Sequence, residues 1–127
     1  PYSKLVSENV TIKIKKDEEG NLVEECGYLG EKIHGTRIIW HPTGVKISET
    51  SFEYGVMQGK HTSWYLSGQA ALYAEVVSGN YHGLFIAYWP NGKKREQGYF
   101  EKGERIGVFE SWSDAGELMA ERNYDDK

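Results

Sequence analysis

The sequence lacks several features that mark whole classes of protein. It has one cysteine, Cys26, so no disulfide can form within the chain, which fits a reducing compartment. No apolar run approaches the roughly 20 residues that a membrane-spanning helix needs. No signal-peptide pattern opens the chain. A cytoplasmic location is therefore expected, and a removed targeting segment stays open as the alternative.

Basic charge is also scarce. The 127 residues carry a net charge of −4 and a pI near 5.6. Proteins that hold phosphate backbones usually present a basic surface, so this balance argues against nucleic acid as a partner. The compact basic run Lys93, Lys94 and Arg95 is a weak candidate for contact with anionic lipid headgroups. Glutamates beside it offset its charge, so a solvated turn is the preferred interpretation.

Glycine and aromatic residues are abundant and periodic. Tyr and Trp favour strands and Gly favours turns, which predicts an all-β protein. Twelve of the fifteen glycines recur every 24 residues, in three columns: Gly20, Gly44, Gly68, Gly92 and Gly116; Gly35, Gly59, Gly83 and Gly107; Gly55, Gly79 and Gly103. The aromatics keep the same period, most clearly at Trp40, Trp64, Tyr88 and Trp112. Such a period indicates a tandem repeat.

Each repeat unit has the pattern of a β-hairpin. In one unit, residues 84–89 form an aromatic strand, Pro90-Asn91-Gly92 a turn, and residues 93–100 the return strand. Hairpins joined by short links predict an elongated, twisted antiparallel meander, with a closed up-and-down barrel as the alternative. We expect one domain over residues 1–127, with units at about 9–28, 29–52, 53–76, 77–100 and 101–124. Residues 113–122 have a helix-friendly composition, but the repeat register favours strand there.

The motif of these units resembles the MORN-repeat variant. It is seen at Gly83, Phe85, Tyr88 and Gly92, and again at Gly107, Phe109, Trp112 and Gly116. The resemblance covers roughly residues 9–127, with Arg37 and His61 in place of the first aromatic in earlier units. It implies a scaffold for protein–protein contact. Some members of the family have been linked to membrane lipids, and bacterial members of the variant are often labelled antitoxin-like.

The polar residues do not suggest a catalytic or metal centre. Glu25, Glu49 and Glu121 share one column, so each has nearly the same environment, whereas a catalytic carboxylate pair needs two different ones. No histidine or cysteine spacing is typical of zinc, and no phosphate-binding glycine loop is present. We predict no metal, no cofactor and no enzyme activity.

The aromatic side chains are the main candidates for a binding site. Trp40, Trp64, Tyr88 and Trp112 are expected to form a core stripe on one face of the sheet. The predicted partner-binding residues are Tyr65, Trp89, Phe85, His61 and Phe109. The favoured function is a non-catalytic protein–protein interaction module, of which an antitoxin or immunity protein is one form. The alternatives are a small-ligand binder, for a glycan or an anionic lipid, and a self-assembling homo-oligomer.

Overall fold

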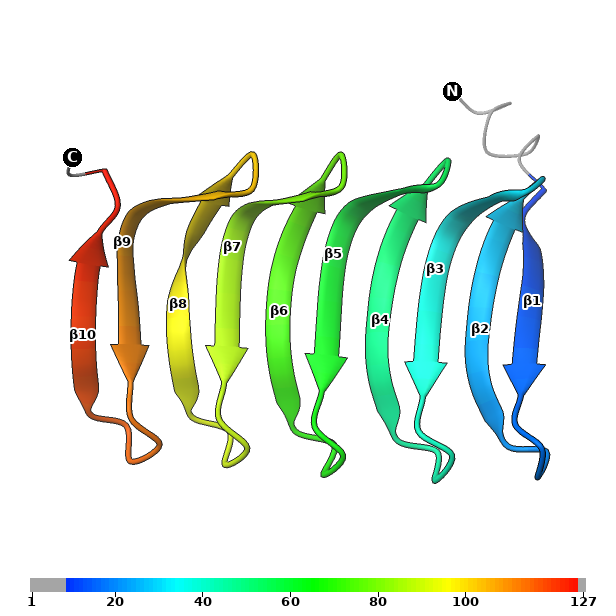
Figure 1. Ribbon diagram of the computed structural model, residues 1–127, viewed down its shortest axis with the longest axis horizontal. Helices are drawn as coiled ribbons and strands as arrows, with labels where there is room; N and C mark the ends of the chain where they lie inside the picture. The colour runs from blue at the N-terminus through cyan, green and yellow to red at the C-terminus, as the bar shows by residue number, and fades with distance from the viewer. Residues whose placement is uncertain (1–8, 126–127) are drawn as a thin grey trace.

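A computed structural model describes residues 9–125 as one antiparallel sheet of ten strands, whose order in the sheet is their order in the sequence (Figure 1). Each strand pairs with its neighbours in the chain. The strands are β1 (Thr11–Lys16), β2 (Leu22–Leu29), β3 (Lys32–Trp40), β4 (Lys46–Glu53), β5 (Val56–Trp64), β6 (Ala70–Val77), β7 (Asn80–Tyr88), β8 (Lys94–Glu101), β9 (Glu104–Trp112) and β10 (Leu118–Asn123).

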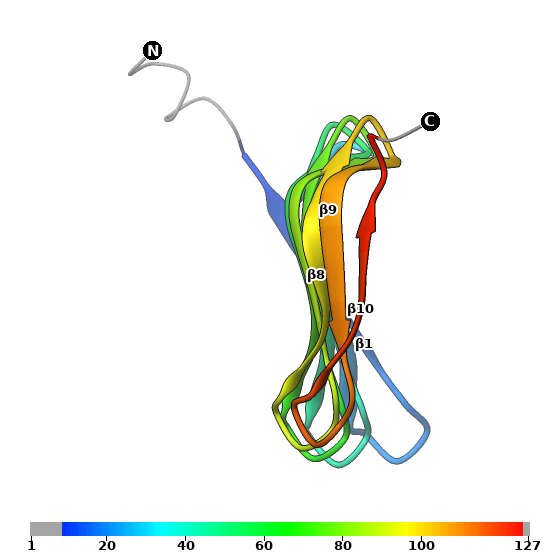
Figure 2. The ribbon, with the colours of Figure 1, turned by 90° about the vertical axis from the view of Figure 1, so that its left-hand side faces the viewer.

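The predicted all-β meander is confirmed, and the barrel alternative is wrong. Strands β1 and β10 lie at opposite ends of the sheet and do not pair within residues 9–125 (Figure 1). Seen along the row of strands, the sheet is a single layer (Figure 2). Residues 113–122 form a turn followed by β10 rather than a helix, so the repeat register determines their structure there.

Two kinds of turn alternate along the chain, and each explains a glycine column. Within a hairpin, the backbone N–H of Gly68 donates to the carbonyl of Tyr65 at 2.8 Å, and Gly68 has a φ of 93°. This is a type I turn closed by a left-handed residue. Between hairpins, Ser78 and Gly79 have φ values of 51° and 85°, as a two-residue type I′ turn requires. Both turns need a conformation that glycine adopts without strain.

The sheet has two chemically different faces. Side chains alternate between the faces along each strand, and the strand register places Ala74 opposite Phe85 and Phe85 opposite Gly98. We call this side the packed face. On the other side, which we call the open face, Tyr73 lies opposite Ile86 and Ile86 opposite Gln97.

The hydrophobic core lies on the packed face, in the C-terminal half of the sheet. Phe85 and Phe109 are 8% and 3% exposed, and the ring of Phe100 lies 5.2 and 5.5 Å from theirs. Ala74 and Ala87 are fully buried and make room for these rings. The tryptophan column, predicted to be core, is instead half-buried on the open face, where no second layer of the described chain covers it.

Candidate functional site

Two of the predicted partner-binding residues are not at the surface. Phe85 and Phe109 belong to the core, with Tyr124 packed against Phe109 at a centroid distance of 5.3 Å. The prediction that these two rings form an exposed aromatic face is therefore wrong. Phe109 is buried because Gly98, which lies opposite Phe85, has no side chain. The Phe109 ring therefore packs directly over the backbone at Gly98.

Tyr65 and Trp89 are half-buried and connect neighbouring hairpins. The Tyr65 hydroxyl donates to the carbonyl of Tyr88 at 2.6 Å, and the Trp89 indole N–H donates to the carbonyl of Trp112 at 2.9 Å. Each donor thus reaches one repeat ahead. Their polar atoms are occupied within the protein, which gives both residues a structural role.

His61 is also half-buried, on the packed face. Its Nδ1 lies 2.7 Å from the hydroxyl of Thr50. Burial lowers the pKa of His61 below its usual 6.5. The structure therefore places His61 between two strands, apart from the turn-end side chains of Tyr65 and Trp89.

The three cations of the basic run are exposed and contact different neutral groups. The Lys93 ammonium donates to the carbonyl of Ala115 at 3.1 Å, and the Lys94 ammonium donates to Gln97 at 2.6 Å. The Arg95 guanidinium lies 5.5 Å from the centre of the Trp89 ring. Each cation already has a partner within the chain. Residues 9–125 contain no helix long and apolar enough to cross a membrane.

Several residues with acid–base or nucleophilic potential are paired or buried. Glu24 is 8% exposed and accepts from Arg37 at 2.6 Å, which lowers its pKa. Burial raises the pKa of the Cys26 thiol, which disfavours the reactive thiolate. Glu49 accepts from Lys46 at 2.7 Å. Within residues 9–125, no group of three or more His, Cys, Asp or Glu side chains is arranged to hold a metal ion.

An apolar patch lies on the open face, near the links between hairpins. Tyr99 and Val108 are 53% and 46% exposed. Tyr99 lies directly opposite Leu84 on β7 and Ile106 on β9. We call these four residues the open-face patch. No repeat pattern in the sequence marks this patch, because Ser51 and Glu75 occupy the position of Tyr99 in the two preceding units.

Two carboxylates face one another beside this patch. Glu110 on β9 lies directly opposite Glu121 on β10, and no cation pairs with either side chain within the described chain. Like charges directly opposite one another destabilise a sheet. The open face therefore combines exposed apolar area with uncompensated negative charge.

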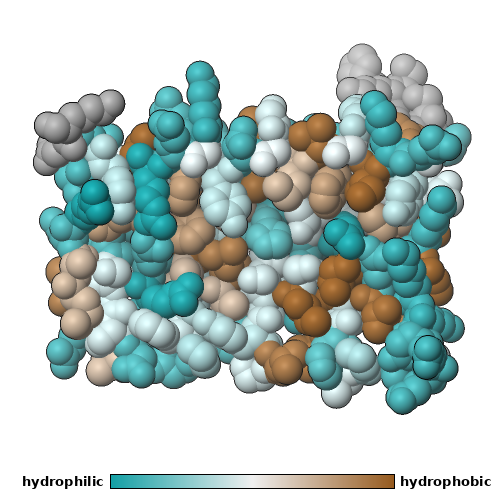
Figure 3. All heavy atoms as spheres, viewed as in Figure 1, coloured by the Kyte–Doolittle hydropathy of each residue, from teal (hydrophilic) through white to brown (hydrophobic). Residues whose placement is uncertain are grey.

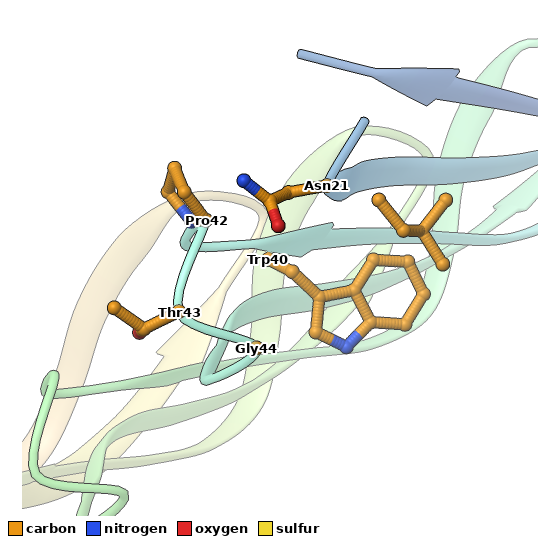
Figure 4. A pocket seen from close by; sticks show the side chains of 6 residues that line it. Asn21, Trp40, Pro42, Thr43 and Gly44 are labelled. Carbon is orange, nitrogen blue, oxygen red and sulfur yellow. The ribbon is translucent and has the colours of Figure 1, made fainter. Parts of the chain in front are cut away.

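A second surface feature lies at the turn end of the N-terminal strands, and it occurs twice. Two open pockets of about 400 and 410 Å³ are present there. Asn21, Leu22, Trp40, Pro42, Thr43 and Gly44 line the first (Figure 4). Val45, Lys46, Trp64 and Gly68 line the second. Four positions of the first pocket correspond, 24 residues later, to the four residues of the second: Asn21 to Val45, Leu22 to Lys46, Trp40 to Trp64 and Gly44 to Gly68. The two pockets are therefore the same site in consecutive units. We call them the tandem tryptophan pockets.

The turn glycines of the next two units have closer neighbours than those beside the two pockets. A Cβ added to Gly44 or Gly68 would meet nothing within 4 Å. At Gly92 it would lie 3.1 Å from the Gln69 side chain, and at Gly116 it would lie 3.6 Å from the Lys93 side chain. Gln69 and Lys93 take the places of Asn21 and Val45. A side chain of the preceding unit therefore lies nearer to the turn glycine in these two units than in the two that carry the pockets.

The architecture defines a tandem hairpin-repeat protein with an open, single-layer sheet. Residues 81–102 match the family model described as the MORN repeat variant, a segment that contains most of β7, the turn after it and all of β8. One unit of the chain is thus similar to the MORN repeat variant, and MORN repeats suggest a repeat-type binding module. A comparison with curated proteins found no match.

Proposed function

We propose that this protein is a non-catalytic module that binds a protein partner through the open-face patch. The observation that carries the proposal is the exposure of Tyr99 and Val108, at 53% and 46%, on a regular antiparallel sheet. Exposed apolar residues beside a tyrosine are typical of the anchors of protein interfaces. A sheet face also presents these side chains in fixed positions, which lowers the entropy lost on binding.

The charge of the open face indicates the kind of partner. Glu110 and Glu121 lie opposite one another next to the patch, and the chain as a whole carries a net charge of −4. A lysine or arginine of the partner would relieve the repulsion between these carboxylates. We therefore expect an apolar surface with a basic rim, and association that weakens as salt is raised. An antitoxin or immunity protein acting in the cytoplasm against a basic partner is one form of this function.

The proposal is tested by capture from lysate of the native host, followed by titration of the captured protein. Tagged wild-type protein is compared with Tyr99→Ser/Val108→Ser and with Leu66→Ser. Leu66 is the matched control because it is 60% exposed but lies in a turn away from the patch. We expect one stoichiometric partner, retained by the control and bound at least about tenfold more weakly by the double variant.

Two results would contradict this function. One is a partner that binds wild type and both variants equally. The other is recovery of the protein alone, which would direct attention to self-assembly through the exposed edge strands β1 and β10.

A further inference from the structure

The spacing of the tandem tryptophan pockets suggests a ligand with a repeating structure. Equivalent residues in consecutive units are two strands apart in an antiparallel sheet. Strands lie about 4.8 Å apart, so the two pockets are separated by about 9.6 Å. A polyproline II helix rises about 3.1 Å per residue and turns once every three residues, or about 9.3 Å. Side chains three residues apart on such a helix therefore match the pockets.

The hydrogen-bonding groups of the pockets also favour an extended peptide. In the described chain, the indole N–H groups of Trp40 and Trp64 have no acceptor, in contrast to that of Trp89. No buried polar side-chain atom is unpaired in this part of the protein, so both N–H groups face solvent. A peptide carbonyl beside each pocket would accept from them.

The other polar groups around the pockets are already in use. The Asn21 amide donates to the Asp17 carboxylate at 3.1 Å, and the Lys46 ammonium donates to Glu49 at 2.7 Å. A proline ring needs only apolar contact, whereas a sugar ring would draw on polar side chains that here already have partners in the chain. Each pocket supplies that contact with an indole and an aliphatic side chain, Leu22 in the first and Val45 in the second.

Charge marks one end of the row. Glu18 and Glu19 occupy the positions one repeat before Pro42 and Thr43, in the turn that precedes the first pocket. Both are exposed, and neither has a cationic partner within residues 9–125, although Lys16 lies two and three residues away in sequence. A basic residue placed one helical turn before the first proline would lie near these carboxylates.

We propose that the tandem tryptophan pockets bind a proline-rich peptide segment in the polyproline II conformation, with two prolines three residues apart and a basic residue three before the first. Aromatic-lined grooves with free donors suit such segments. The site is separate from the open-face patch. It lies at the turn end of the N-terminal units, whereas the patch lies near the links of the C-terminal units.

The test uses a fluorescein-labelled synthetic peptide and the full chain, with fluorescence anisotropy as the readout. The peptide has arginine, two spacers, proline, two spacers and proline. A control peptide of the same composition has its prolines four residues apart. We expect it to bind at least tenfold more weakly, because its second ring falls between pockets.

Protein variants locate the binding. Trp40→Leu and Trp64→Leu should each weaken binding at least tenfold. Trp112→Leu, the matched control in the same column, should bind like wild type because the Lys93 side chain lies beside its turn glycine. Trp40→Phe keeps a ring and loses the N–H, so it should still show a severalfold loss if the leucine variant unfolds. Glu18→Gln/Glu19→Gln should weaken binding of the arginine peptide but not of one with alanine in its place.

A gain of binding gives the sharpest result. Gln69→Val places at the third unit the residue that lines the second pocket, so a peptide with a third proline three residues on should bind this variant more tightly than wild type. The proposal is overturned if the four-spaced peptide binds equally, if Trp40→Leu and Trp64→Leu are silent, or if the pockets take cello- or chito-oligosaccharides and not the peptide. Tyr99→Ser/Val108→Ser should leave peptide binding unchanged, so the two proposals fail separately.

Discussion

The substitution Gly98→Ala tests how the core is built. Gly98 lies on β8, and its φ is not positive, so alanine meets no backbone strain there. In an open strand position this change would stabilise the protein by roughly 0.5–1 kcal/mol, because glycine loses more backbone entropy on folding. A Cβ at this position, however, would lie 2.5 Å from three ring atoms of Phe109.

The ring of Phe109 cannot move away easily. It is 3% exposed, with Phe100 at 5.5 Å, Tyr124 at 5.3 Å and the Arg105 guanidinium at 4.6 Å from its centre. Overpacking in such a place costs roughly 1–3 kcal/mol. We therefore expect a net loss of about 1–2 kcal/mol in the free energy of unfolding, and a Tm lower by several degrees.

Chemical denaturation followed by circular dichroism measures this effect, with Phe109→Leu alone and combined with Gly98→Ala. In the double variant the added methyl occupies space that the shorter leucine leaves, so the two changes should couple by about 1 kcal/mol. Gly98→Ala with stability equal to or above that of wild type would refute the account of the core.

Two further predictions concern hydrogen-bonded aromatic and imidazole groups. Since burial lowers the pKa of His61, protonation favours the unfolded state, so stability should fall as pH drops below the unfolded value of about 6.5. His61→Phe should show a smaller fall than wild type in urea unfolding at pH 7.5 and 5.5, and equal slopes for the two proteins would refute this role. Tyr65→Phe removes the donor to the Tyr88 carbonyl and should lower the free energy of unfolding by about 0.5–1.5 kcal/mol. A Tm unchanged in that variant would show that water replaces the bond without loss.

The repeat itself was readable from the sequence because it is imposed by backbone geometry. The glycines at Gly68 and Gly79 mark two turn types that few other residues tolerate, and the fixed period between turns determines strand length and order. An antiparallel meander then follows from short links. The predicted architecture is correct for this reason, even where composition alone favoured a helix near the C-terminus.

The choice of core face was not readable in the same way. A period of two along each strand says which residues share a face, but not which face is covered. Both faces carry aromatic rings, and the larger tryptophans suggested the wrong one. The core forms on the face where phenylalanine lies opposite small residues on the neighbouring strands, as Phe85 does between Ala74 and Gly98. Gly98 falls outside the three glycine columns, and this was the signal that it had a packing role rather than a turn role.

The candidate sites depend on departures from the repeat. Tyr99 stands in a column that holds serine or glutamate in the two units before it, and the two pockets lie beside Asn21 and Val45, where later units have the longer side chains of Gln69 and Lys93. Whether a side chain fills or leaves a pocket depends on its direction, which the sequence does not give.

Departures from the repeat also divide the array into units that form the apolar core and units that carry the pockets. On the packed face, the C-terminal units stack phenylalanine rings around the ion pair of Glu96 with Arg105. The N-terminal units have polar contacts without such a ring cluster, as between Glu24 and Arg37 and between Thr50 and His61. Apolar burial is the larger and less salt-sensitive source of stability. The aromatic half therefore supports the sheet as a whole. The tandem tryptophan pockets lie outside this aromatic core, in units that contribute less to the buried apolar cluster.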